Sequence, residues 1–258
     1  ASYRRQRQMC IRDRYPEGEN IDKDYLVVNP LGTVPAIEID GNVICGSEEI
    51  IYQIDKIDSN NNCSLYPDNV DETDVRKWAS HTTITDGVKF ASTLGTIMPV
   101  FSSPLLQYMI KALPFSSIMK ILLRHPRNDR KMIFTAMYFG NPSKKIPFMG
   151  VNNYVDEIIK LEKLFSDGRN FFYNTFSHVD INLMCVFNRL VDLGLEETVT
   201  HKTPYICAYW EKLKSRNSYQ NGILNYYTDK EKELLSEFYK NNDSSVLKAI
   251  LEQIDKKL

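Results

Sequence analysis

One short segment of the 258-residue chain has the pattern of paired β-strands, and it constrains the fold more than any other feature. Residues 36–40 alternate at period two and residues 43–45 are apolar, and between them lies Asp40-Gly41, a dipeptide typical of a hairpin turn. A helix is expected next, because Ser47 can serve as its N-cap, two acids follow in the first turn, and isoleucines recur at helical spacing. The segment therefore predicts a β-β-α unit.

The rest of the chain predicts helices and no second hairpin. The polar residues 58–62 lead into a linker at residues 63–70, which we place between two domains. Ser177 and Asp180 have the spacing of a capping box at the start of one later helix. The expected helices span residues 71–90, 105–124, 129–140, 151–166, 177–193, 203–216 and 228–258.

The first 14 residues differ in composition from those that follow. Five arginines lie between Arg4 and Arg14, and the string RQRQMCIRDR resembles translated sequencing-adapter sequence from the ends of metagenomic contigs. We expect residues 1–14 to be non-native and the chain to be a metagenomic fragment whose first domain lacks its beginning. A basic arm or a targeting peptide is the alternative interpretation.

Charge and cysteine content argue against several classes of function. With 32 basic and 33 acidic residues, the overall charge provides no attraction to nucleic acid or to anionic lipid. The cysteines are odd in number and form no CxxC pair, and the four histidines share no metal-ligand spacing. We expect no metal, buried thiols and a cytoplasmic location. The cysteines are Cys10, Cys45, Cys63, Cys185 and Cys207.

One uncharged stretch, residues 90–110, approaches the length of a bilayer span. Gly95, Pro99 and Pro104 interrupt it, together with several polar residues. We therefore expect a buried or pocket-lining segment and no membrane association.

Four motifs, in the same order along the chain, resemble those of glutathione transferases. Asn29–Ala36 resembles the NPxGxVPxL motif of this family, and Val43–Ser47 resembles the strand and helix start that follow it. Phe176–Ile181 resembles the family's capping motif, and Tyr205–Tyr219 resembles its closing segment. The resemblance runs from about Tyr15 to Gly222.

The resemblance implies a fold of two domains. An α/β thioredoxin-like N-terminal domain, incomplete here, would bind glutathione with residues 15–62, and an all-α C-terminal domain would occupy residues 71–258. It also implies a homodimer, with glutathione as co-substrate and a small hydrophobic molecule as substrate.

Val34-Pro35 is the first candidate part of a glutathione site. A residue before proline favours extended backbone, and proline has no N–H group. The resemblance implies a cis bond here, which would turn Val34 outward so that its main-chain N–H and C=O bind the cysteinyl unit of glutathione, as in strand addition. A strand start limited by proline is the alternative.

Gly46 and Ser47 form the second candidate part. A helix N-terminus suits a carboxylate, and the resemblance implies that Ser47 holds the γ-glutamyl carboxylate of glutathione. Gly46 stands where the family has Glu, so the γ-glutamyl amine would need Glu48 or a partner subunit. Thr33 replaces a Lys or Gln near the glycyl end, so we expect one contact fewer and reduced affinity. An ordinary cap is the alternative for Ser47.

The implied reaction is attack by the glutathione thiolate on a hydrophobic electrophile. A free thiol has a pKa of about 8.5, so a donor must stabilise the thiolate near neutral pH. In the family this donor is a Tyr, Ser or Cys at the end of the first strand, upstream of Val34. We assign no catalytic residue, because that strand is missing and Cys10 lies too close to Val34 to replace it.

The region from Gly87 to Phe148 is longer and more apolar than a minimal member of the family needs. It resembles the β-aryl etherase, tetrachlorohydroquinone dehalogenase and ganglioside-induced-differentiation-like branches, which implies ether cleavage or reductive dehalogenation. Four side chains could line an electrophile pocket, although core packing is favoured for each one. They are Phe90, Met98, Phe101 and Met109.

The same region contains a basic cluster, for which a solvated helix-turn-helix face is favoured over a site for an anionic partner. The cluster consists of Lys120, Arg124, His125, Arg127, Arg130 and Lys131.

A glutathione-dependent transferase is the leading functional hypothesis. A non-catalytic module for binding or protein association is the alternative. The retained Val34-Pro35 and Ser47 favour the enzyme, whereas Gly46 and the absent start favour the alternative.

Overall fold

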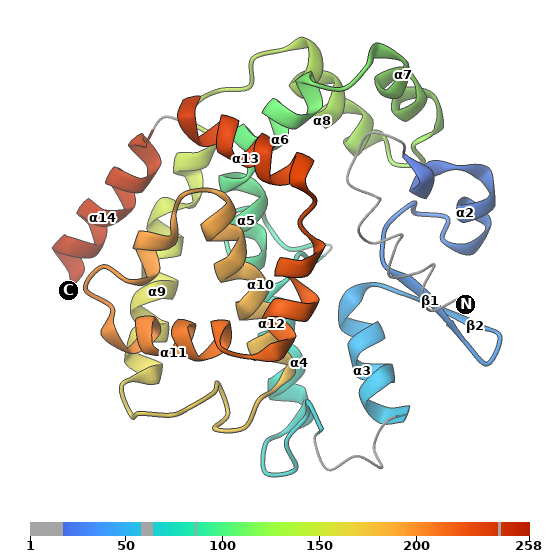
Figure 1. The fold of residues 1–258 in the computed structure, drawn as a ribbon. Coiled ribbons are helices and arrows are strands. Elements are labelled where there is room, and N and C mark those ends of the chain that lie inside the picture. Colours follow the sequence, from blue (N-terminus) through green and yellow to red (C-terminus); the bar gives the residue numbers. More distant parts are fainter. Residues whose placement is uncertain (1–17, 58–63, 86, 242–243) are drawn as a thin grey trace. The chain divides into compact units, whose positions relative to one another are not determined.

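The computed structural model describes residues 18–57, 64–85, 87–241 and 244–258 (Figure 1). The chain divides into two compact units, each described here by itself. Unit 1 contains Ala1–Asn62 and Leu106–Ser143, and unit 2 contains Cys63–Leu105 and Lys144–Leu258. The sequence placed residues 106–143 in the helical domain, whereas their contacts group them with the N-terminal segment. The segment expected to be non-native, residues 1–14, lies outside the described residues.

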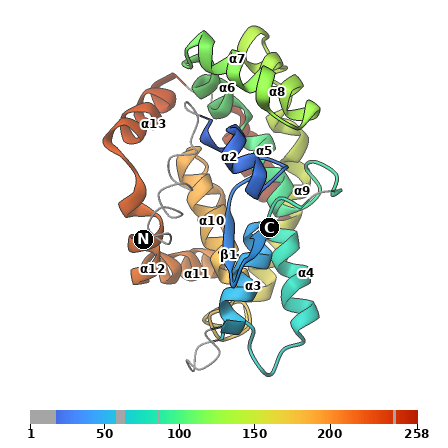
Figure 2. The ribbon, with the colours of Figure 1, turned by 90° about the vertical axis from the view of Figure 1, so that its right-hand side faces the viewer.

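Unit 1 combines a β-hairpin with short helices from two parts of the chain. The first part contains η1 (Glu19–Ile21), α2 (Lys23–Val28), β1 (Ala36–Ile39), β2 (Asn42–Cys45) and α3 (Ser47–Ile57). The second part contains the end of α6 (Ser103–Lys111), α7 (Phe115–Arg124) and α8 (Asn128–Phe139), which lie together in both ribbon views (Figures 1 and 2). The expected β-β-α unit is confirmed.

The hairpin has the turn that the sequence predicts. β1 and β2 pair antiparallel, and the register sets Ala36 opposite Cys45 and Ile39 opposite Asn42. The two turn residues, Asp40 and Gly41, have φ angles of 50° and 80°. A two-residue loop with positive φ at both positions matches the twist of the flanking strands, and Asp-Gly adopts it readily.

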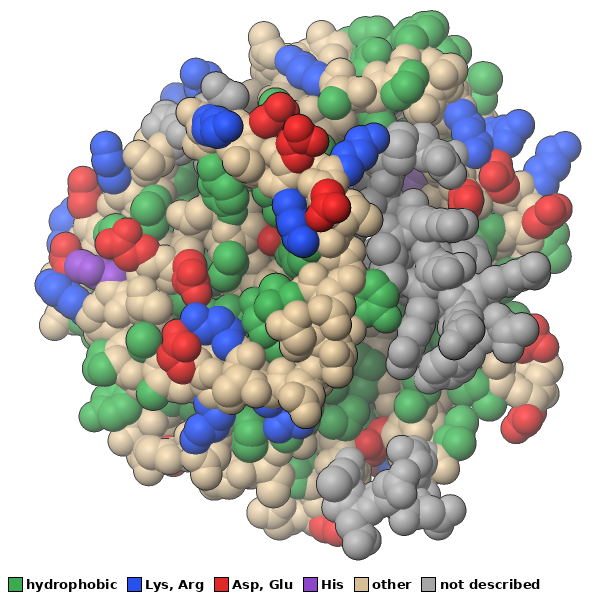
Figure 3. All heavy atoms as spheres, in the orientation of Figure 1, with side chains coloured by type: hydrophobic (Ala, Val, Ile, Leu, Met, Phe, Trp, Pro, Cys, Tyr) green, Lys and Arg blue, Asp and Glu red, His purple; other side chains and the backbone are tan. Residues whose placement is uncertain are grey.

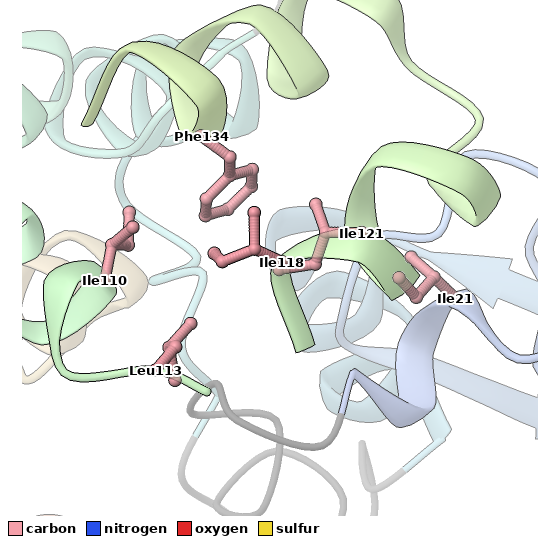
Figure 4. Packing of buried hydrophobic residues seen from close by; sticks show 6 residues of the cluster. All are labelled: Ile21, Ile110, Leu113, Ile118, Ile121 and Phe134. Carbon is pink, nitrogen blue, oxygen red and sulfur yellow. The ribbon is translucent and has the colours of Figure 1, made fainter. Parts of the chain in front are cut away.

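The buried core of unit 1 joins its two parts (Figure 4). Ile21 packs into the same cluster as Ile118 and Ile121 of α7, and Phe134 of α8 is directed toward Ile118. Two exposed ion pairs support this packing. Asp22 contacts Lys120 at 3.1 Å and Arg124 at 2.9 Å. The segment before the hairpin therefore depends on residues 106–143 for its core.

All secondary-structure elements in the described residues of unit 2 are helices. Its elements are α4 (Glu72–Thr82), α5 (Leu94–Phe101), η2 (Pro147–Gly150), α9 (Val151–Phe165), α10 (His178–Asp192), η3 (Glu196–Val199), α11 (Pro204–Lys214), α12 (Asn217–Gly222), η4 (Leu224–Tyr226), α13 (Asp229–Asn241) and α14 (Ser245–Lys257). None of the helices in the described part of the chain is long and apolar enough to cross a membrane.

The capping box predicted at the start of α10 is confirmed, and its carboxylate does more than cap the helix. Asp180 accepts hydrogen bonds from the main-chain N–H and the hydroxyl of Ser177, at 2.8 and 2.7 Å. It also accepts from the N–H of Phe172 at 2.9 Å and from the hydroxyl of Tyr209 at 2.6 Å. Asp180 is fully buried, so this one side chain connects α10 to the preceding loop and to α11.

Several helix boundaries differ from the expected ones for local reasons. α4 ends at Thr82, where the threonine hydroxyl bonds to the carbonyls of Trp78 and Ala79 and so satisfies acceptors of the last turn. The helix expected at 105–124 is interrupted at Pro114, whose nitrogen carries no hydrogen.

Helix α5 was not expected. A capping box between Thr93 and Thr96 starts it, and Gly95 lies so close to α4 that an added Cβ atom would be 1.8 Å from the carbonyl oxygen of Thr83. Gly95, which argued against a membrane span in this stretch, is therefore what allows the helix to approach α4.

Candidate functional site

The loop before Val34 is held rigid by side chains of unit 1. Asn29 is buried, and its amide donates to the carbonyl of Thr33 at 2.7 Å and to the Thr33 hydroxyl at 2.9 Å. The Tyr25 hydroxyl donates to the same carbonyl at 2.5 Å, and Asn20 donates to the carbonyl of Gly32 at 2.7 Å. The carbonyl groups on the N-terminal side of Val34 are therefore bonded within the unit.

Val34 itself lies outside the strand ladder. The Val34–Pro35 peptide bond is cis, and β1 begins only at Ala36. In the part of the chain that the structure describes, no hydrogen bond engages the main-chain N–H or C=O of Val34. Two main-chain polar groups on a half-buried residue are thus available to an extended ligand.

The second part of the site is the start of α3. Ser47 is the first helical residue, and the carbonyl of Gly46 accepts the first helical hydrogen bond, from Ile50 at 3.0 Å. Gly46 therefore occupies the N-cap position that the sequence analysis gave to Ser47. Its φ angle is 91°, a value that glycine adopts without strain.

Ser47 is exposed at the end of the helix where main-chain N–H groups have no helical acceptor. Glu48 and Glu49 lie in the first turn of α3, where their charges favour the helix. A carboxylate that approached Ser47 would meet the positive end of the helix dipole.

The structure brings the two candidate parts together. The N–H of Gly46 donates to the carbonyl of Pro35 at 3.2 Å, so the cis loop and the start of α3 are directly bonded. All four residues expected to bind glutathione, Val34, Pro35, Gly46 and Ser47, therefore lie at one place in unit 1. That they bind it remains a prediction.

Two residues that position the loop were not expected from the sequence. Asn29 and Tyr25 fix the carbonyl of Thr33, and neither was singled out. An asparagine directly before a proline is a recognised turn signal, and here its side chain also accepts from the N–H of Leu31 at 3.1 Å. The Asn-Pro dipeptide could have identified Asn29, whereas nothing in the local pattern marks Tyr25.

The four side chains considered for an electrophile pocket have different environments. Met98 and Phe101 are buried in α5, and Phe101 packs edge-to-face on Tyr154 with ring centroids 5.2 Å apart. Phe90 is exposed, and Met109 is half-buried in the part of α6 that belongs to unit 1. Core packing accounts for Met98 and Phe101.

The basic cluster at the α7–α8 turn contains one buried histidine. The Nδ1 atom of His125 accepts a hydrogen bond from the N–H of Arg127 at 3.1 Å, which requires this nitrogen to be unprotonated. Burial, followed by the charges of Arg130 and Arg127, lowers the pKa of His125 below its ordinary value of 6.5. Among the described residues, no group of histidine, cysteine and carboxylate side chains could hold a metal ion.

Comparison with known proteins agrees with this geometry. Residues 7–57 match the family model of the glutathione S-transferase N-terminal domain, a span that includes the cis loop and the start of α3. This part of the chain is therefore similar to a glutathione S-transferase N-terminal domain. The match begins within the segment 1–14 that composition sets apart from the rest.

The fold of this transferase-like chain is also that of a solved structure. The crystal structure of beta-etherase LigF from Sphingobium sp. strain SYK-6 matches it with a TM-score of 0.65 over 86% of this chain and 85% of that chain. The two sequences are 17% identical, so this likeness is evidence for a shared fold alone. No curated protein sequence matches the chain significantly.

Proposed function

We propose that the chain binds glutathione at Val34 and Ser47 and transfers the glutathionyl group to a hydrophobic electrophile. The observation that carries the proposal is the hydrogen bond between Gly46 and Pro35, which joins a main-chain segment outside the strand ladder to a helix N-terminus. Together these two elements offer partners for the peptide groups of the cysteinyl unit and for the γ-glutamyl carboxylate.

In the proposed reaction, the glutathione thiol loses its proton, and the thiolate attacks an electrophilic carbon of the second substrate. A C–S bond forms while the bond to the leaving group breaks, and the leaving group departs as a halide or an oxyanion. The match of residues 7–57 to a glutathione S-transferase N-terminal domain and the fold match with a beta-etherase support this class of reaction. Cleavage of an ether and displacement of a halide both fit it.

Ser47→Asp tests the binding site. A negative charge in the first turn of α3 favours the helix itself, but it repels an incoming carboxylate. We therefore expect the variant to fold at least as stably as the parent and to lose glutathione binding, measured by calorimetric titration at millimolar glutathione. Asn42→Asp, which adds the same charge on the exposed β2 strand, is the matched control and should bind normally.

A second measurement separates the transferase from a binding module. We expect retention on immobilised glutathione and conjugation of a chlorinated aromatic compound. Binding without conjugation of any electrophile would favour the non-catalytic alternative, for which the glycine at position 46 is the supporting observation. If the parent chain does not bind millimolar glutathione, the site assignment is wrong.

A further inference from the structure

The α7–α8 hairpin of unit 1 has two apolar sides, and only one of them faces the core. Ile118 and Ile121 of α7 and Phe134 of α8 point into the buried cluster (Figure 4). Other large apolar side chains of the same helices are exposed to solvent. Their exposed fractions are 58% for Phe115, 74% for Leu123, 72% for Met132 and 61% for Phe139.

These exposed residues form stripes at helical spacing. On α7, Phe115 and Leu123 are eight residues apart, which sets them on neighbouring parts of one face. On α8, Met132 and Phe139 are seven residues apart and lie on the side opposite Phe134.

The two stripes meet. The rings of Phe115 and Phe139 contact each other edge-to-face, with centroids 6.5 Å apart. Hydrophobic side chains accordingly gather over α7 and α8 at the top of Figure 3. The hairpin thus presents several exposed apolar side chains, two of them in direct contact, and a large exposed apolar patch on a monomeric protein marks an interaction site.

The segment that carries this surface is rich in cations. Residues 106–143 contain six lysines and arginines and one acid, whereas the whole chain has a net charge of −1. Lys120 and Arg124 contact Asp22, and Arg127 contacts Asp129, but exposed ion pairs of this kind leave a positive field around the hairpin. Although the charge of the whole chain is nearly balanced, the α7–α8 hairpin is therefore both basic and apolar.

From this combination we infer that the α7–α8 hairpin binds the surface of an anionic lipid bilayer. The apolar residues would enter the interface between headgroups and acyl chains, and the lysines and arginines would contact lipid phosphates. A helix that lies on the membrane needs neither the length nor the uniform apolarity of a spanning helix. This inference is independent of glutathione binding and replaces our expectation of no membrane association.

The charge of the α7–α8 hairpin favours binding to a bilayer over binding to a second copy of the chain or to nucleic acid. A second copy in a two-fold contact would place like-charged surfaces against each other, which is unfavourable. Nucleic acid would satisfy the cations but would leave the exposed phenylalanines without apolar partners, because such interfaces are predominantly polar.

Vesicle flotation of the full chain tests the inference. We expect the chain to float with vesicles of phosphatidylcholine and phosphatidylserine, to remain unbound with phosphatidylcholine alone, and to be released by added salt. The double variant Phe115→Ser, Phe139→Ser should bind at least about tenfold more weakly. Met149→Ser, at an exposed apolar position of unit 2, should bind like the parent.

A charge variant gives a second readout. Removing two cations with Arg130→Ser and Lys131→Ser should weaken binding about 25-fold, because each cation near an anionic surface contributes about fivefold. Lys248→Ser with Lys256→Ser, on exposed positions of α14, is the matched control. Circular dichroism checks that every variant is folded, and glutathione binding should be the same in all of them.

Three results would overturn the inference. The parent chain could fail to float with anionic vesicles, or the hairpin variants could float as well as their controls. The third is a dimer in solution that becomes monomeric with Phe115→Ser and Phe139→Ser while no lipid binds, which would identify the surface as an interface between copies.

Discussion

Replacing Asp180 by alanine should destabilise unit 2 more than any other single polar substitution in α10. The change removes one buried acceptor of four hydrogen bonds. The N–H groups of Phe172 and Ser177 and the hydroxyl of Tyr209 would then be buried donors without their acceptor, at a cost of about 1–3 kcal/mol each. We expect the free energy of unfolding to fall by about 3–6 kcal/mol, a large part of the 5–15 kcal/mol typical of a folded domain.

Tryptophan fluorescence during urea denaturation measures this effect on the relevant unit. The chain has two tryptophans, Trp78 and Trp210, and both lie in unit 2. Their signal therefore reports the unfolding of the unit that contains Asp180. A shift of the midpoint with an unchanged slope would show a change in stability and not a change in the denatured state.

Tyr209→Phe is the matched control. Burial, together with the charge of Asp180, raises the pKa of Tyr209 well above 10, so its hydroxyl remains a donor at any ordinary pH. Removing that donor leaves Asp180 with its other three partners and should cost about 1–2 kcal/mol. The double variant should cost less than the two single changes added, because both remove the same bond. If Asp180→Ala were no more destabilising than Tyr209→Phe, our account of the buried carboxylate would be refuted.

Two further substitutions test local packing and a buried titratable group. Gly95→Ala should cost about 3 kcal/mol or more, because the new Cβ atom would collide with the Thr83 carbonyl, whereas Gly222→Ala, where nothing lies within 4 Å, should change stability by less than about 1 kcal/mol; equal midpoints in urea would contradict this. For His125, whose folded pKa is lowered, the unfolded chain takes up a proton near pH 6.5 while the folded ring stays neutral. The free energy of unfolding should therefore fall as pH decreases below about 7 until the folded pKa is passed. His125→Asn keeps an acceptor for the Arg127 N–H, and its stability should depend less on pH; parallel pH profiles for parent and variant would reject the assignment.

Local signals in the sequence were sufficient for the elements that form the candidate site. The Asp-Gly turn predicted the hairpin because two positive φ angles suit few other dipeptides, and the Ser177–Asp180 spacing predicted the capping box. The Val34-Pro35 and Gly46-Ser47 segments were also identified from sequence.

What sequence could not supply depends on contacts between distant residues. Helix α5 was missed, and the close approach of Gly95 to the Thr83 carbonyl, which gives the glycine its role in that helix, is not visible in the local sequence. Similarly, no pattern within residues 106–143 shows that Ile118 shares a core with Ile21, and the grouping of this segment with the N-terminal part became visible only in the structure. The outward apolar stripe of α8 has the same period as an inward one, so sequence alone could not distinguish them.

The discontinuity of unit 1 has a consequence for synthesis of the chain on the ribosome. Ile21 of η1 is made early, but the core into which it packs needs Ile118 and Phe134, which follow only after residues 63–105 of the other unit have emerged. Until then the nascent segment has few apolar neighbours of its own and is open to misassociation or to chaperones. Unit 1 therefore cannot finish folding until part of unit 2 has been synthesised.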